Sequence, residues 1–562
     1  MAKDKKKKKK KKESSETGYN NFSQLMGQGK VKESKAKKVS ALPPGINLGN
    51  PIDRSSDQMF LGTDYREVLI PERSWGEILA DVEHWTILPF THGIEMELII
   101  ADDNGDYPPG DEMVFRMKEI VKDAIRIMDQ VLYEGRADFL PTPDYIRQKV
   151  KARPFGKDDI EKGYAMDIRY QLPNGAEVDI DTFARDGNVT AVTYILELVT
   201  PPCEYAEELA YWASTLFLLA KTTLPNDLHI IASAINPAAK EYMRGLSQAD
   251  HHHLGSFNSD LEKAQAYCML RNFIPHLVAL TCNSPILNNK PTDIVKVVNN
   301  RITAPNCTRS LRLKYNTTML SNNDPKQYTP YLTDLGENSV KFFLQTVQKA
   351  SLEDARFQDL FCFTDWNTIE CRVSDAQISI CRRIGIGLLI QTLYYKAKKL
   401  LKKGVWVPDA GSETITMNRQ GAIERGLISL FRTSPNLSRE FLEQYDPEFA
   451  EQYLGPENQP VRYMTQAVQR MFFYIKDELK ELGFLYSPFL KPVLQSVFGG
   501  VSYAEPPITE AEYQLSLYKY KLDKGENPNI LYDLIYFTIE YCKDPLNNPL
   551  TGVLTLPKEM RD

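Results

Sequence analysis

The sequence lacks any apolar run long enough to span a membrane, and no apolar segment follows its charged N-terminus. A membrane-spanning helix needs about 20 mostly apolar residues, and a secretory signal needs an apolar core. The eight cysteines include no C-x-x-C pair, which favours reduced, mostly buried thiols over a disulfide framework or a zinc site. These absences predict a cytoplasmic protein with no transmembrane segment.

Beyond its first 40 residues the chain also lacks an excess of positive charge. Residues 1–40 carry 14 Lys against 4 Asp and Glu, whereas the remaining 522 residues carry 54 Lys and Arg against 70 Asp and Glu. Binding to nucleic acid needs a positive face toward the phosphates, so we do not expect the body to bind nucleic acid. The basic tail is open to two interpretations: a solubilising segment, or a tether to an acidic partner.

Composition and periodicity divide the chain into four regions. Residues 1–40 cannot bury enough apolar surface to fold and are predicted to be a disordered basic tail. Residues 41–85 form a lead-in segment punctuated by Pro and Gly. Residues 86–435 alternate between strand and helix patterns, and residues 436–562 form a helical C-terminal extension with Pro-rich joints.

The main region is predicted to be an α+β domain built on an antiparallel sheet. Strands with a period of two at 165–172, 177–184 and 190–200 read as a meander, with a Pro-Asn-Gly turn between the first two. Further expected strands lie at 89–101, near 229–234, around 251–253, at 308–314 and at 368–375. Helices are expected at 112–134, 205–221, 260–281, 376–402 with Asp375 as N-cap, 460–482, 509–523 and 529–543.

The first strand carries two carboxylates in an apolar setting. Glu95 and Glu97 are two positions apart, so on a strand they share one face, while Ile94, Met96 and Leu98 share the other. Two like charges at a packed sheet are costly unless a positive group lies between them. A divalent cation would resolve this, although a solvated edge strand is the alternative.

Other strands supply further candidate ligands. Glu197 is the one acidic residue in the apolar run 194–200, and such breaks of pattern concentrate at functional sites. A water-facing edge glutamate is the other interpretation. In the run 251–253, His251 and His253 would share a strand face and His252 would point away. Two histidines at this spacing before a glycine favour contact with a metal or a phosphate.

Charged pairs recur on two later segments. Glu370 and Arg372 alternate on a predicted strand, where they form either a surface ion pair of little energetic value or a metal ligand beside a phosphate-binding arginine. Arg312 would share a face with Ser310 and Lys314 on the strand predicted at 308–314. Carboxylates with one imidazole suit Mg²⁺ or Mn²⁺ better than zinc.

Six ordered motifs resemble the carboxylate–amine ligases of the glutamate–cysteine ligase type 2 family, in the glutamine synthetase-like superfamily. The resemblance extends over about residues 86–435. It is carried by G-x-E-x-E (Gly93, Glu95, Glu97), L-E-L ending in Thr200, H-x-H-L-G (His251, His253, Gly255), N-S-P (283–285), T-I-E-x-R-x-x-D (368–375) and N-R-x-x-A-x-x-R-G-L (418–427).

The resemblance implies a curved antiparallel sheet flanked by helices, with ATP and two or three Mg²⁺ or Mn²⁺ ions. It also implies a role for each candidate residue. The metal ligands would be Glu95, Glu97, Glu197, His251 and Glu370. His253, Arg372 and Arg425 would contact the nucleotide, Arg312 and Arg372 would act in catalysis, and Asn418 matches a motif position. Members of the superfamily often assemble, so a homo-oligomer is a further expectation.

The expected activity is therefore ATP-dependent amide formation through an acyl phosphate, with γ-glutamylcysteine formation and glutathione biosynthesis as the default. Residues 287–293 depart from the Gly- and Arg-rich segment that the family has after N-S-P, so other small carboxylates and amines stay open. Two alternatives remain: ligation of a carboxylate to a protein amine, and a non-catalytic nucleotide-binding scaffold.

Overall fold

The structure is a computed structural model, and it describes most of the chain from residue 73 onward. The chain divides into two compact units, Met1–Asn50 and Pro51–Asp562, and all described residues belong to the second. The predicted basic tail therefore lies outside the described residues. The described ranges are 73–106, 123–152, 166–171, 177–179, 193–240, 248–292, 296–298, 301–303, 308–315, 332, 334–349, 358–364, 366–435, single positions between 439 and 454, 461–498 and 509–535.

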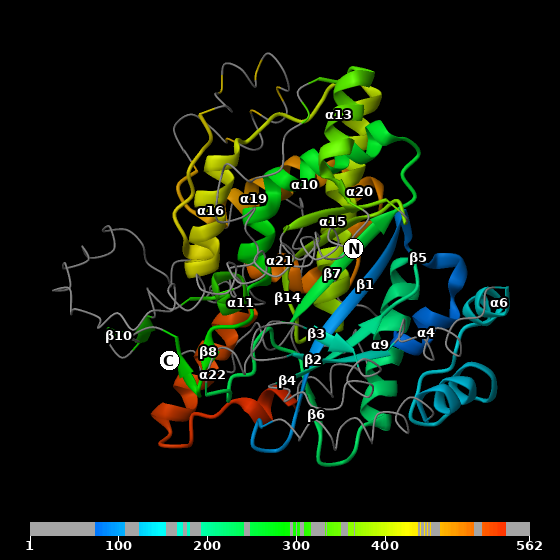
Figure 1. The fold of residues 1–562 in the computed structure, drawn as a ribbon, viewed down its shortest axis with the longest axis vertical. Coiled ribbons are helices and arrows are strands. Elements are labelled where there is room, and N and C mark those ends of the chain that lie inside the picture. Colours follow the sequence, from blue (N-terminus) through cyan, green and yellow to red (C-terminus); the bar gives the residue numbers. More distant parts are fainter. Residues whose placement is uncertain are drawn as a thin grey trace, which may run out of the picture. The chain divides into compact units, whose positions relative to one another are not determined.

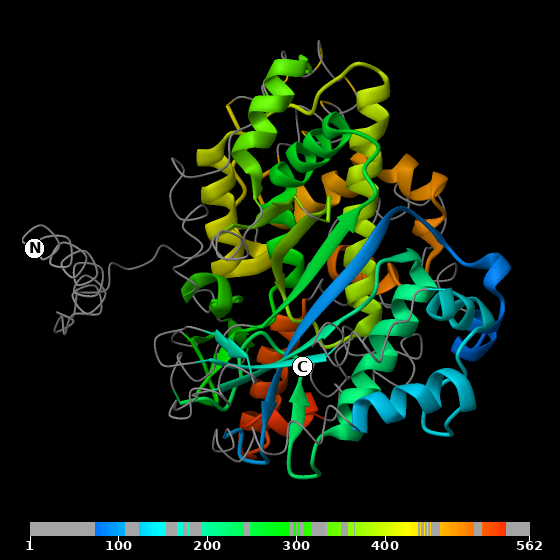
Figure 2. The same cartoon turned by 45° about the vertical axis from the view of Figure 1, so that its right-hand side comes forward.

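A ten-stranded sheet runs through the second unit in the order β12-β13-β14-β7-β1-β4-β2-β3, with β5 and β6 also paired to β1. Among the described strands, every pairing in this sheet is antiparallel except that of β12 with β13. Figures 1 and 2 show the long strands β1 and β7 side by side. The strands are β1 (Ile87–Ala101), β2 (Met166–Gln171), β3 (Glu177–Asp179), β4 (Thr193–Val199), β5 (Cys203–Tyr205), β6 (His229–Ile231), β7 (Ala249–Gly255), β12 (Gln348–Lys349), β13 (Leu360–Phe363) and β14 (Ile369–Asp375).

The helices flank this sheet, and the predicted α+β class with a mostly antiparallel sheet is confirmed. Two small hairpins, β8 (Ile286–Leu287) with β9 (Lys290–Pro291) and β10 (Lys296–Val298) with β11 (Arg301–Thr303), lie outside the large sheet. The α-helices that lie wholly within the described residues include α4 (Trp75–Ala80), α6 (Asp144–Ala152), α9 (Ala206–Thr223), α10 (Asp260–Thr281), α11 (Leu311–Tyr315), α13 (Glu337–Val347), α15 (Ile380–Lys402), α16 (Ser412–Arg425), α19 (Met464–Tyr474), α20 (Lys476–Glu481), α21 (Lys491–Phe498) and α22 (Glu510–Asp523).

The predicted meander of the second, third and fourth strands is wrong. Strand β4 lies between β1 and β2, and β3 pairs with β2 at the edge of the sheet. The described side chains Ile195, Leu196 and Leu198 of β4 are fully buried. A strand that is apolar on both faces belongs in the sheet interior, whereas the short Glu-Val-Asp segment of β3 suits an edge.

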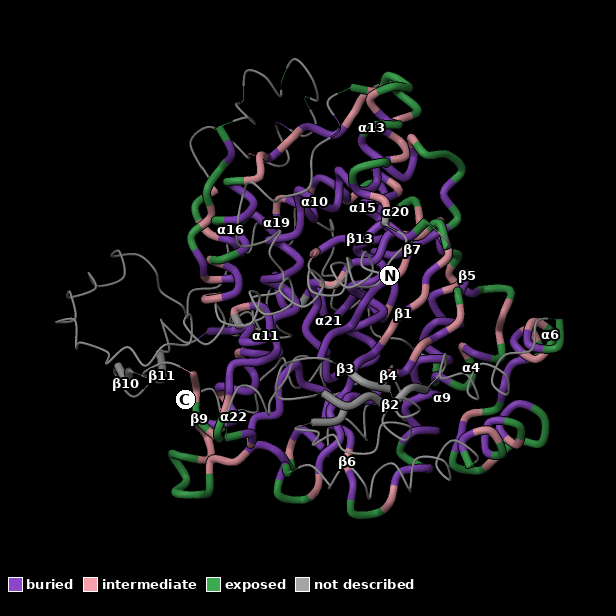
Figure 3. The backbone as a smooth tube through the Cα atoms, in the orientation of Figure 1, coloured by how far each residue is buried: buried purple, intermediate pink, exposed green. Residues whose placement is uncertain are grey.

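One face of the sheet packs on the main hydrophobic core. Ile94, Met96 and Leu98 have no exposed surface and belong to the same core as α9, α10 and α15. Figure 3 shows that nearly all of α10 and most of α15 are buried. The prediction that these three side chains share one face of β1 is confirmed; they face the helices, so Glu95 and Glu97 lie on the opposite face.

The C-terminal helices pack on both faces of the same sheet. Helices α19, α20 and α21 contribute Met471, Phe472, Leu479 and Val493 to the main core. Helix α22 instead belongs to a second core with Ile99 of β1, on the face that carries Glu95 and Glu97. The predicted region boundaries at residues 40, 85 and 435 stay predictions.

Two other expectations concern cysteines and membranes. The six cysteines within the described residues are all buried and free. None of the helices in the described part of the chain combines the length and apolarity that a bilayer crossing requires.

The burial of Glu510 at the start of α22 makes the stability of this fold depend on pH. Burial, opposed in part by Arg382, raises the pKa of Glu510 from 4.5 to about 7. The folded chain therefore holds this proton more tightly than the unfolded chain. The contribution of this proton to the free energy of unfolding is complete below pH 4.5. It falls by roughly 3 kcal/mol as the pH rises to 7.

The variant Glu510→Gln has no proton to lose, so its stability relative to wild type should rise by roughly 3 kcal/mol between pH 4.5 and 7. Urea unfolding at a series of pH values measures this difference. Parallel stability curves for the two chains across that window would show that Glu510 does not titrate there.

Candidate functional site

The candidate site lies on the sheet face opposite the main core, where β1, β7 and β14 are adjacent. In the register of these strands Glu95 is opposite His251, and His253 is opposite Glu370. Because side chains alternate along a strand, all four project from the same face. Residues separated by more than 100 positions in the sequence are thereby brought to one point.

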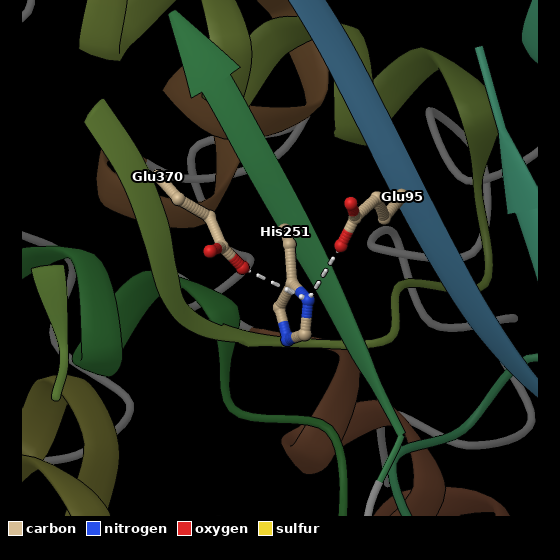
Figure 4. A group of neighbouring side chains, drawn as sticks. All are labelled: Glu95, His251 and Glu370. Atoms are coloured by element: carbon tan, nitrogen blue, oxygen red, sulfur yellow. Dashed lines mark hydrogen bonds and ion pairs between the residues drawn. The ribbon is translucent and has the colours of Figure 1, made fainter. Parts of the chain in front are cut away.

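Glu95, His251 and Glu370 converge closely enough to share a metal ion, as Figure 4 shows. The Nδ1 atom of His251 lies 3.2 Å from Oε2 of Glu95 and 3.3 Å from Oε1 of Glu370. One candidate ligand atom from each of the three residues lies within 4.8 Å of the other two. The three residues come from three neighbouring strands, so the sheet itself sets their spacing.

Two further predicted site residues border the trio, His253 on β7 and Arg372 on β14. The Nε2 atom of His253 lies 3.2 Å from Oε1 of Glu95 and 3.8 Å from Oε1 of Glu370. Arg372 donates from Nη1 to Oε1 of Glu370. The prediction that His251 and His253 share a face is confirmed, and His252 points into the core, where its Nδ1 lies 3.0 Å from Nε2 of His92.

The predicted ligands Glu97 and Glu197 lie next to the trio. Glu97 and Glu197 are direct partners in the register of β1 and β4, on the face of Glu95. Oε2 of Glu97 accepts a hydrogen bond from the backbone N–H of Ala249 at 3.0 Å and lies 4.0 Å from Nε2 of His251. The two glutamates thus continue the acidic row away from Glu370, and their role as ligands stays a prediction.

The surroundings of the site shift the pKa values of its two carboxylates, Glu370 and Glu95, in opposite directions. Burial raises the pKa of Glu370 more than Arg372 and His253 lower it. At Glu95 burial also raises the pKa, but His253 and His251 together bring it well below its usual range. Two carboxylates that share a site cannot both ionise freely, so pKa shifts of opposite sign are the expected result.

The pKa values of the two histidines, His251 and His253, also shift in opposite directions. Burial and the charge of Arg372 hold the pKa of His251 well below 6.5, so its imidazole is neutral, which is the form that binds a metal. Burial lowers the pKa of His253 as well, but Glu95 and Glu370 outweigh it and raise that pKa.

The donor set suits a divalent cation. Oε2 of Glu370 is buried and has no hydrogen-bond partner among the described residues. An ionised oxygen left in this state is costly unless a cation or a proton lies against it. Two carboxylates and one neutral imidazole are ligands that Mg²⁺ and Mn²⁺ accept. The residues present therefore fit the metal that the sequence predicts.

The strand predicted at 308–314 is wrong, because residues 311–315 form helix α11. The hydroxyl of Ser310 accepts a hydrogen bond from the N–H of Leu313, as an N-cap residue does. Serine before a helix is a start signal that competes with a strand pattern this short. Arg312 is consequently buried, and its Nη2 donates to the backbone carbonyl of Arg372 at 3.1 Å.

Asp375 is not the N-cap of α15, which begins at Ile380 after the capping residue Ser379. Its carboxylate is fully buried and accepts four hydrogen bonds. The donors are the N–H of Asn283 at 2.8 Å, the hydroxyls of Ser284 and Ser310 at 2.9 Å each, and Nε of Arg312 at 2.9 Å. Sequence reasoning missed this centre, because its four donors lie at least 63 positions away.

The other two residues that the family resemblance implies, Asn418 and Arg425, lie on α16, and the fold does not bring them to the trio. The side chain of Asn418 donates to the carbonyl of Arg432 and accepts from its N–H, which is a structural role. Arg425 is half-buried at the end of α16 and makes no hydrogen bond to the trio among the described residues. Its predicted contact with a nucleotide stays a prediction.

No protein-family model matches the sequence, and no curated protein matches it. Among solved structures, the chain is similar to a glutamate–cysteine ligase from Francisella tularensis in complex with AMP, with 11% identity, a TM-score of 0.42 and coverage of 84% of this chain and 92% of that chain. A bifunctional glutathione synthetase from Pasteurella multocida is 12% identical with a TM-score of 0.38; the match covers 81% of this chain and 51% of that chain.

A third similar structure is the complex of the prokaryotic ubiquitin-like protein Pup with its ligase PafA. It has 11% identity and a TM-score of 0.34, over 81% of this chain and 73% of that chain. At these values the likeness does not assign a family or a substrate.

Proposed function

We propose that the chain is an ATP-dependent carboxylate–amine ligase that forms an amide through an acyl phosphate. The observation that carries this proposal is the convergence of Glu95, His251 and Glu370 on one buried point, with Arg372 bound to Glu370. A divalent-cation site beside an arginine is the arrangement that phosphoryl transfer requires.

The charges of the site match the charges of the reaction. Transfer of a phosphoryl group to a carboxylate brings two anions together, and the site has to offset that repulsion. Glu95, His251 and Glu370 would hold Mg²⁺ or Mn²⁺, which supplies charge neutralisation at the phosphates. Arg372, held beside the ligand carboxylate, and His253, whose pKa is raised, provide positive charge at the same point.

Burial of the site supports the second step of the proposed reaction, in which the amine attacks the acyl phosphate. The side chains of His251 and Glu370 are 3% and 1% exposed, so these two groups are kept from bulk water. An acyl phosphate is hydrolysed by water, and an amine can compete for it only where water is excluded. We infer that His253 and Arg372 contact the ATP phosphates, and that glutamate and cysteine are the substrates, as the ordered motifs favour.

The test is to incubate the full chain with ATP, Mn²⁺ and pools of carboxylates and amines, and to follow ADP release together with new amide masses. We expect ADP release that requires both a carboxylate and an amine, with glutamate and cysteine as the active pair. A chain that binds Mn²⁺ and ATP but releases no ADP with any pool would refute the ligase function. A new amide on a protein side chain would refute the small-molecule assignment alone.

A further inference from the structure

Helix α22, near the C-terminal end of the described chain, is tied by side-chain bonds to the segments that surround Asp375. Figure 1 shows α22 beside α11 and β8, and the chain turn 283–285 leads directly into β8. The bonds come from Glu510, Glu512 and Gln514.

Each of the three contacts reaches a different segment. Oε2 of Glu510 accepts from the N–H of Ile378 at 2.8 Å, three residues after Asp375. Oε1 of Glu512 accepts from Nε of Arg309 at 2.8 Å, three residues before Arg312. These contacts hold the segment after β14 and the segment before α11.

Gln514 holds the third segment, the Asn-Ser-Pro turn. Its Nε2 lies 2.6 Å from Oδ1 of Asn283 and 3.0 Å from the carbonyl oxygen of the same residue. Gln514 is 1% exposed and Asn283 is fully buried, so water cannot replace these bonds. The N–H of Asn283 in turn donates to Asp375.

All three segments meet at Asp375, and from there the contacts lead to the candidate metal site. Asp375 binds Nε of Arg312, Nη2 of Arg312 donates to the carbonyl of Arg372, and Arg372 donates to Glu370. Among the described residues, α22 makes no hydrogen bond or ion pair to the trio itself, so we argue its effect through these bonds.

We propose that α22 is a clamp whose Glu510, Glu512 and Gln514 position Arg312 and Arg372 at the candidate site. The inference rests on the proposed function of that site and deepens it, because it makes the C-terminal helix part of the catalytic arrangement. Glu510, Glu512 and Gln514 are positioning residues that act through Asp375 and Arg312. A chain whose α22 is undocked would keep its metal ligands and lose the orientation of its arginines.

The variant Gln514→Met tests the clamp, because it keeps the side-chain volume and removes the amide. The matched control is Leu517→Ala, which removes apolar packing from the same helix without removing any of the three polar contacts. Hydrogen exchange of the full chain, followed by mass spectrometry, is the first measurement. We expect Gln514→Met to accelerate exchange in residues 308–315 and 375–378, and Leu517→Ala to accelerate it only within 509–535.

The second measurement is ligase turnover together with Mn²⁺ affinity. Positioning contacts around metal ligands are typically worth 10- to 100-fold, so we expect kcat for Gln514→Met to fall about tenfold more than for Leu517→Ala at equal thermal stability. Exchange at 308–315 that is the same in both variants would overturn the clamp. If wild type binds Mn²⁺ but turns over no substrate, the ligase function fails, and the clamp is judged by exchange and Mn²⁺ affinity.

Discussion

Replacing Glu370 with glutamine is expected to abolish ligase turnover and to weaken Mn²⁺ binding at least about 100-fold. Loss of a residue that merely supports a metal ligand costs 10- to 100-fold, and Glu370 is placed to be a ligand itself. The substitution preserves shape but removes the charge that pairs with Arg372 and with the cation. Isothermal titration with Mn²⁺ and ADP release in the amide-forming assay measure the two effects.

A buried carboxylate elsewhere in the fold provides the control. Glu478 is also buried and ion-paired, with Lys396 at 3.4 Å and Lys399 at 2.8 Å, between α20 and α15. We expect Glu478→Gln to lower stability and to leave Mn²⁺ affinity unchanged. Equal Mn²⁺ affinity in wild type and Glu370→Gln would remove the trio as a metal site, and the proposed function would lose the observation that carries it.

The second large effect is expected at Asp375, where Asp375→Ala should lower the free energy of unfolding by about 3–5 kcal/mol. Removing one partner of a buried ion pair leaves the other charge uncompensated, and here that charge is the guanidinium of Arg312. Two serine hydroxyls and one backbone N–H lose their acceptor as well. Urea unfolding followed by circular dichroism gives the change in free energy.

The double variant Asp375→Ala with Arg312→Met distinguishes the cost of leaving the Arg312 charge uncompensated from the cost of lost packing. It removes the buried guanidinium, so it should be more stable than Asp375→Ala alone. A single variant that costs less than about 1 kcal/mol, or a double variant that is no more stable than the single one, would show that Arg312 is not held by Asp375 in the way described here.

Local sequence pattern is enough to predict which face of each strand carries the candidate ligands. A strand has a period of two, so the pairs Glu95 with Glu97, His251 with His253 and Glu370 with Arg372 had to share faces once their segments were extended. The same local rule set the long helix α10, whose predicted bounds 260–281 coincide with the observed Asp260–Thr281. These properties depend on neighbours along the chain, and the sequence contains them.

The adjacency of the strands and the meeting of polar groups depend instead on the packing of distant segments. The predicted meander is wrong because strand order depends on which distant segments pair. The apolar pattern of β4 suits the sheet interior, but it does not show that β1 and β2 are its neighbours. Arg312 lies on a helix and not on the predicted strand, because the cap at Ser310 outweighs an alternation only seven residues long. The role of Asp375 and the bond from Gln514 to Asn283, which spans 231 positions, arise from contacts between distant segments. Local periodicity carries no information about such contacts, and the packed sheet and its covering helices select them.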